Sequence, residues 1–249
     1  KVSRARKHVA ELETEVAKYL SRDPGAIVVT IDDKTKKHGL LFGQSEAIPF
    51  DVALIFGDAI HNLRGALDLL ANDLVTLSGV EPKKVYFPFA DSGPGLEDQI
   101  KDKMRGASDP AKDIVRGLKP YKGGNVLLRA LHDLDITDKH IDVVRSGMQA
   151  ATGSVPFKQV ASDRPNRITL EANFGAMRRV PVSADKPRAP GGVKVVGKLA
   201  DQTIRLVIGN DFPLSGSPVI ETLHQMAGLV DSIIQTFEAH CFGSKHPGP

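Results

Sequence analysis

The chain has 249 residues, 41% of them hydrophobic and 25% charged, which is enough apolar sequence to bury a core and excludes a disordered or fibrous chain. Its formal net charge of +3 comes from interspersed basic and acidic residues, unlike the dense basic surface of a dedicated nucleic-acid-binding protein. The single cysteine, Cys241, excludes an intrachain disulfide, and no run reaches the roughly 18 to 20 apolar residues of a membrane-spanning helix, so we expect a cytoplasmic protein without a membrane partner.

The first half of the chain predicts a helix, a hairpin and a longer helix. Residues 2–20 place apolar side chains at intervals of three and four, the period of an amphipathic helix. Residues 26–44 contain two strand-like runs around a polar turn, which predicts a β-hairpin. Residues 52–78 form the longest apolar-rich run with helical period, and Pro49 stands just before it, where helices accept proline.

The next elements are shorter, apart from one long helix. Residues 85–90 (VYFPFA) predict an edge strand or packed loop, because Pro88 has no N–H to donate. The DSGPG segment that follows predicts a turn. Residues 96–119 predict one or two short surface helices, and residues 126–144 predict a second long helix. Residues 155–212 predict an antiparallel meander of about four strands separated by polar turns.

The last helix has the clearest predicted start, with Ser217 as its N-cap and Pro218 as its first residue. Together these elements predict an α+β fold, in which long amphipathic helices form a bundle-like core with an N-terminal hairpin and an inserted antiparallel sheet. We expect a single domain over residues 1–249. Its expected parts are a helical core at 1–22, 50–149 and 217–243, the hairpin at 26–44 and the meander at 155–212.

The helix at 52–78 has two different sides. Its apolar side is continuous, whereas the other side lacks the Lys and Glu residues of an ordinary water-facing stripe. Gly57 and Gly65 each lower helix propensity by roughly 1 kcal/mol relative to Ala, which is easier to explain if another backbone or a ligand comes close. The polar residues within about 60° of His61 on a helical wheel are Asp58, His61, Arg64, Asp68 and Asn72.

The helix at 126–144 has a similar polar side. Its apolar side is predicted to hold Leu127, Ala130, Leu131, Leu134 and Ile141, and its polar side Arg129, His132, Asp135 and Lys139. Asp138 is predicted at the edge of the core, where an unpaired carboxylate would be costly, so it requires a partner.

Two segments, GDAIHNLRGALD at 57–68 and LHDLDITDKH at 131–140, carry a resemblance to a bacterial protein family that shares a GDxxHNLRxALDxL helix and a later LxxxDxxDKH helix. The resemblance extends loosely over most of the chain but implies no activity. The chain departs from the family pattern at Leu69, a position where histidine is frequent in the family. The signature residues that it implies are Asp58, His61, Asn62, Arg64, Asp68, Asp138, Lys139 and His140.

Side by side, the two helices would bring an imidazole, a carboxylate and cations together, and three chemistries fit. Glycine-rich phosphate loops and the common cysteine, serine and zinc motifs are absent. The first chemistry is acid–base hydrolysis, in which a histidine moves a proton, a carboxylate orients its ring and a cation stabilises an anionic transition state. The histidine would be His61 or His140, the carboxylate Asp68 or Asp138, and the cation Arg64 or Lys139.

The second chemistry is a divalent metal site, for which the candidate ligands are Asp58, His61, His132, Asp135 and His140. Against it, Arg64 and Lys139 would place positive charge beside the cation. The third is a satisfied polar network that only fixes how the helices pair.

We expect hydrolysis by the His/Asp/Arg/Lys cluster, acting on a phosphodiester such as RNA or on another small anionic substrate, because RNA carries its own 2′-hydroxyl nucleophile. The alternative is a non-enzymatic binding or defence-associated module with an architectural cluster, and the further alternative is a metal-dependent helical-bundle enzyme. The sequence leaves open whether the protein is an enzyme and whether it is a homodimer.

Overall fold

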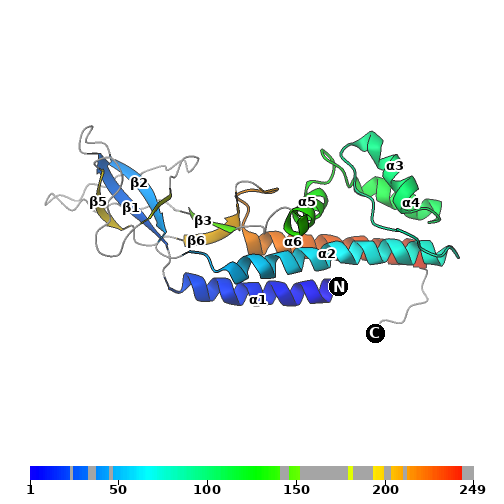
Figure 1. Cartoon of the computed structure of the whole chain (residues 1–249), viewed down its shortest axis with the longest axis horizontal. Coiled ribbons are helices and arrows are strands. Elements are labelled where there is room, and N and C mark those ends of the chain that lie inside the picture. The colour runs from blue at the N-terminus through cyan, green and yellow to red at the C-terminus, as the bar shows by residue number, and fades with distance from the viewer. Residues whose placement is uncertain are drawn as a thin grey trace. The chain divides into compact units, whose positions relative to one another are not determined.

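The structure is a computed structural model, and it describes residues 1–22, 25–32, 38–44, 47–140, 146–151, 179–181, 193–198, 203–209 and 212–242 (Figure 1). This part of the chain is mostly helical, and its long helices form a bundle-like arrangement, which confirms the coarse fold class. The chain divides into two compact units. The first unit is Lys1–Thr14, Phe50–Arg145 and Ile208–Pro249, and the second is Glu15–Pro49 and Ser146–Val207. The single domain stays a prediction.

The core of the first unit is built on α2 (Phe50–Leu77), α6 (Val219–Phe237) and the part of α1 (Val2–Leu20) that ends at Thr14. Glu13 of α1 pairs with His224 of α6 at 2.7 Å, and Arg6 of α1 pairs with Asp231 of α6. The residue numbers rise along α1 while their partners' numbers fall along α6, so the two helices are antiparallel, as Figure 1 also shows. Within the described residues, no helix is long and apolar enough to cross a membrane.

The helices predicted at 2–20 and 52–78 are confirmed, the second beginning two residues early at Phe50. The apolar side of α2 is buried throughout, and α2 packs against α5 (Val126–His140) and α6. The predicted start of the last helix is wrong by one residue, because the backbone of Pro218 is extended and α6 begins at Val219. The five predicted core residues of α1 are all buried: Ala5, Val9, Leu12, Val16 and Tyr19.

Two short helices, α3 (Gly93–Lys103) and α4 (Asp109–Leu118), confirm the prediction for residues 96–119. The predicted DSGPG turn is wrong in part, because Gly93 begins α3. Ser92 is its N-cap and its hydroxyl accepts a bond from the Gly95 N–H at 3.3 Å. Ser108 caps α4 in the same way. A π-helical turn, η1 (Glu238–Phe242), follows α6 and contacts α4.

The second unit holds the strands. β1 (Gly25–Asp32) pairs antiparallel with β2 (His38–Gln44), with Ile27 opposite Phe42, which is the pairing expected of the hairpin at 26–44. A third and a fourth strand, β4 (Arg179–Pro181) and β5 (Val193–Lys198), complete the sheet order β4-β2-β1-β5. Separately, β3 (Ser146–Ala151) pairs with β6 (Thr203–Ile208).

The inserted antiparallel meander at 155–212 is not shown. Its described strands do not pair with one another: β5 (Val193–Lys198) joins β1, and β4 (Arg179–Pro181) runs parallel to β2. The two edges of the hairpin offer unpaired backbone groups, which these strands satisfy. The helical core predicted over 50–149 is also wrong at its end, because Ser146–Ala151 is a strand. Residues 141–145, and residues 155–178 of the predicted meander, lie outside the described part.

Candidate polar site between α2 and α5

Part of the polar side of α2 faces α5. Three pairs of positions connect it with α5: Gly57 with Asp138, His61 with Asp135 and Arg64 with His132. The residue numbers rise along α2 while those of their partners fall along α5, so the two helices run antiparallel at this contact. The carboxylate that bonds to His61 is Asp135, which was not predicted from the sequence to orient a histidine.

Arg64 forms the centre of the buried part of this site. Its side chain is only 8% exposed, and its Nη1 donates to Asp68 Oδ1 at 2.5 Å. Nη2 donates to the Phe87 carbonyl and Nε to His132 Nδ1, both at 3.4 Å, while the guanidinium lies 4.7 Å from the centre of the Phe89 ring. Each guanidinium nitrogen thus has a protein partner, and little of the charge reaches solvent.

Asp68 and Asn72 continue the same side of α2 and hold the extended segment at 85–90. The Asp68 carboxylate accepts the Phe87 N–H at 2.9 Å, and Asn72 Nδ2 donates to the Val85 carbonyl at 3.2 Å. Together with Arg64, these side chains satisfy both backbone groups of Phe87, as a neighbouring strand would. The segment is therefore a packed extended loop, which is one of the two structures predicted for it.

His132 is held in a neutral form. Its ring stacks on Phe89 with a 4.2 Å centroid distance and an interplanar angle of 2°. Burial, followed by the positive charges of Arg64 and Arg129, lowers its pKa to about 4, against the opposing effect of Asp133 and Asp135. Since Arg64 Nε donates to Nδ1, the ring proton belongs on Nε2.

His61 has a different environment. Its side chain is 48% exposed, and its Nδ1 lies 3.1 Å from Oδ1 of Asp135, whose side chain is 7% exposed. Within the described residues, Nε2 of His61 has no hydrogen-bond partner. The arrangement is an accessible imidazole whose inner nitrogen bonds to a buried carboxylate, which fixes the ring and leaves its outer nitrogen open to a substrate.

The two glycines of α2 have different surroundings. A Cβ at Gly57 would lie 2.4 Å from Asp138 Oδ2, so the glycine permits the close approach that its position in the helix predicted. A Cβ at Gly65 would meet only Lys1 Cε, at 3.9 Å, which is an ordinary contact. The close approach thus applies to Gly57 alone.

The metal-ligand candidates whose side chains the structure describes are not gathered into a metal site. Within the described side chains, no group of three or more His, Cys, Asp or Glu residues could hold a metal ion. Asp58 is exposed, and Nδ1 of His132 already accepts a hydrogen bond from Arg64. The side chains of Lys139 and His140 lie outside the described part, so their predicted roles stay predictions.

Several residues of the site were not predicted from the sequence to belong to it. Phe87 and Phe89 belong to a segment treated only as an edge strand or loop, although its two buried aromatic rings could have marked it. Arg129 donates to Asp133, at 2.9 Å, and to the Ala90 carbonyl, so it fixes α5 on that segment. Leu128 is fully buried, and the predicted core position Leu127 is only partly so.

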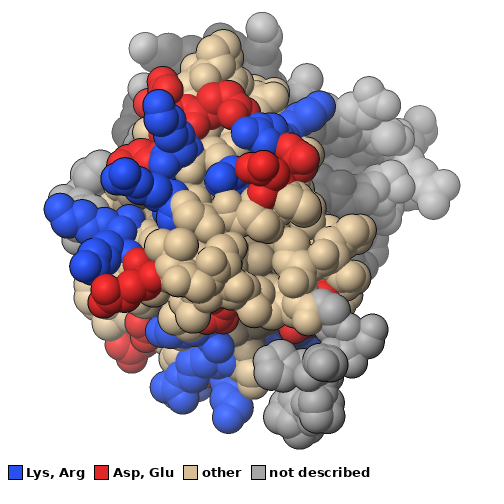
Figure 2. Space-filling view, turned by 90° about the vertical axis from the view of Figure 1, so that its right-hand side faces the viewer, with Lys and Arg blue, Asp and Glu red and all other residues tan. Residues whose placement is uncertain are grey.

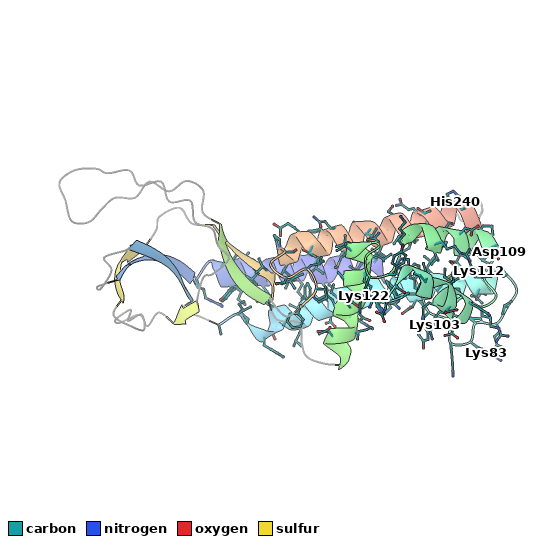
Figure 3. All side chains as sticks on the ribbon, turned by 90° about the horizontal axis from the view of Figure 1, so that it is seen from above. Lys83, Lys103, Asp109, Lys112, Lys122 and His240 are labelled. Atoms are coloured by element: carbon teal, nitrogen blue, oxygen red, sulfur yellow. The ribbon has the colours of Figure 1, made fainter. Side chains whose placement is uncertain are left out.

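The end of the first unit formed by α3 and α4 carries mixed charge. Figure 2 shows blue and red side chains interspersed there, and Figure 3 labels several of them. Each of the labelled lysines has an acidic partner within 3.5 Å: Lys83 with Glu81, Lys103 with Asp102, Lys112 with Asp109 and Lys122 with Asp91. These lysines do not form an unpaired basic patch of the kind that binds a polyanion.

Comparison with known proteins adds no relative: no family model, curated protein or solved structure matches the chain.

Proposed function

We propose that the protein is a hydrolase in which His61 transfers the proton and Asp135 is its positioning residue. The observation that supports this is the half-exposed imidazole bonded through Nδ1 to a buried carboxylate. When the Nδ1–H group of His61 donates a hydrogen bond to Asp135, Nε2 is unprotonated and can accept a proton from a water or hydroxyl nucleophile. The Asp135 carboxylate then stabilises the imidazolium that forms. Nε2 finally returns the proton to the leaving group.

Arg64 is not the transition-state cation in this proposal, because its guanidinium is buried and bonded to Asp68, Phe87 and His132. A phosphodiester substrate such as RNA therefore requires another cation, and Lys139 is the remaining candidate. A neutral ester needs less charge stabilisation at the same histidine. We keep the phosphodiester as one substrate to be tested beside a neutral ester.

The test is hydrolysis by the purified full chain of labelled single-stranded RNA and of p-nitrophenyl acetate. We expect His61→Gln to lower the rate on the accepted substrate by about 100-fold or more, the usual contribution of a general acid–base group. His224→Gln is the matched control, because His224 is also an exposed histidine paired with a carboxylate. Absence of hydrolysis of both substrates, or an unchanged rate for His61→Gln, would contradict the proposal.

A second candidate function is a binding module in which the whole cluster is architectural. The observation that favours it is the saturation of Arg64, whose partners join α2, α5 and the segment at 85–90. It predicts no turnover of either substrate and a loss of folding stability for His61→Gln as large as that for Arg64 variants.

A further inference from the structure

Two histidines lie close to the same carboxylate. His61 Nδ1 is 3.1 Å from Asp135, and His132 stands three residues before Asp135 on α5, near enough for that charge to raise its pKa. A protonated His132 would therefore place a second positive charge near the carboxylate that bonds to His61. That charge would weaken the attraction between Asp135 and the His61 ring.

The surroundings of His132 favour the neutral ring. From α2, Arg64 presents both a positive charge and an Nε–H aimed at Nδ1; from α5, Arg129 adds positive charge, and Asp133 and Asp135 oppose it. Protonating Nδ1 would set two donors against each other 3.4 Å apart. Stacking on Phe89 fixes the plane of the ring, so it cannot easily turn away.

We propose that Arg64 is a positioning residue for His61: by holding His132 neutral and flat against Phe89, it keeps a second positive charge away from the Asp135 carboxylate that bonds to His61. The value of this arrangement to catalysis rests on the proposed function of His61. Arg64 and His61 are three residues apart on α2, and their partners His132 and Asp135 are three apart on α5. The two contacts between the helices are therefore neighbours on both helices.

The test is histidine-ring ¹⁵N NMR of the full chain between pH 5 and 8, with signals assigned from His61→Gln and His132→Asn. In the wild type we expect His132 to stay neutral with its proton on Nε2, and His61 to carry its proton on Nδ1. Arg64→Lys keeps the charge but removes the Nε–H donor. We expect this variant to raise the His132 pKa by about one unit, to mix its tautomers and to weaken the His61 Nδ1–H signal.

Arg129→Lys is the matched control, because Arg129 also stands near His132 but bonds to Asp133 and the Ala90 carbonyl rather than to the ring. We expect it to leave both tautomers unchanged. A wild-type His132 with its proton on Nδ1 overturns the proposal even if Arg64→Lys does not fold, and unchanged His61 signals in a folded Arg64→Lys overturn it as well. The spectra need no substrate, so a failed hydrolysis assay with the expected spectra would remove the proposed function and leave this coupling standing.

Discussion

Arg64 and His61 lie on the same side of α2, three residues apart, yet the structure gives them opposite surroundings. The Arg64 side chain is 8% exposed and bonded to a carboxylate, a carbonyl and an imidazole, whereas the His61 side chain is 48% exposed and, among the described residues, bonded through one nitrogen. A saturated charge can position other groups, but it has no free donor for a substrate. An accessible imidazole with one open nitrogen can still exchange a proton.

The largest effect on stability is expected from Arg64→Met. It removes the cationic partner of the Asp68 carboxylate and one of the two bonds that hold Phe87, so we expect it to lower the free energy of unfolding by about 3–5 kcal/mol in urea titration. Arg116→Met is the control, because Arg116 pairs with Glu97 and Asp113 at the exposed surface. Equal stability losses for the two variants would show that the buried Arg64 contributes no more to stability than the exposed Arg116.

The next effect is a loss of stability in acid caused by His132. Its folded pKa of about 4 is below its ordinary value of 6.5, so the unfolded chain binds the proton more tightly, and stability is lost as pH falls from about 6.5 towards 4. We expect this loss to be on the order of 2–3 kcal/mol, since the ring is partly exposed. His132→Asn should flatten this part of the curve of unfolding free energy against pH; an equally steep curve in the variant would assign the acid sensitivity elsewhere.

The glycines of α2 should respond in opposite directions. Gly57→Ala would place a methyl group 2.4 Å from Asp138 Oδ2, so we expect a loss of about 1–3 kcal/mol despite the better helix propensity. Gly65→Ala meets only an ordinary contact and should stabilise the chain by up to about 1 kcal/mol. Thermal melts of the two variants compare the tightly packed position Gly57 with the open position Gly65. A stabilised Gly57→Ala would contradict the close contact between Gly57 and Asp138 of α5.

The smallest effect on stability is expected from His61→Gln. Its side chain is half exposed and glutamine can still donate a hydrogen bond towards Asp135, so the free energy of unfolding should change by less than about 1 kcal/mol. Chemical denaturation measures this directly. A loss as large as that of Arg64→Met would favour the architectural explanation for the whole cluster.

The helices of the first unit could largely be predicted from the sequence, because their patterns are local. The buried residues of α1 follow a simple 3.6-residue period, and Ser108 caps α4 next to its own helix. The strand pairing could not be predicted, because β4 and β5 pair with a hairpin far away in the sequence.

The sequence placed His61, Arg64 and Asp68 on one polar side of α2, but it did not reveal which groups they contact. Helical period placed Asp135 on a polar side that was expected to line a cleft, and the structure buries it, because that side of α5 faces α2. The neutral form of His132 depends on Arg64, 68 residues earlier in the chain, and on a ring of the 85–90 segment. No local pattern carries that information.

The most direct test of the account is to measure, on the same His61→Gln sample, both the rate of hydrolysis and the free energy of unfolding. The account predicts a rate at least about 100-fold below that of the wild type, with stability changed by less than about 1 kcal/mol. An unchanged rate, or a loss of stability that by itself accounts for the lost activity, would contradict the division between a positioning Arg64 and a proton-transferring His61.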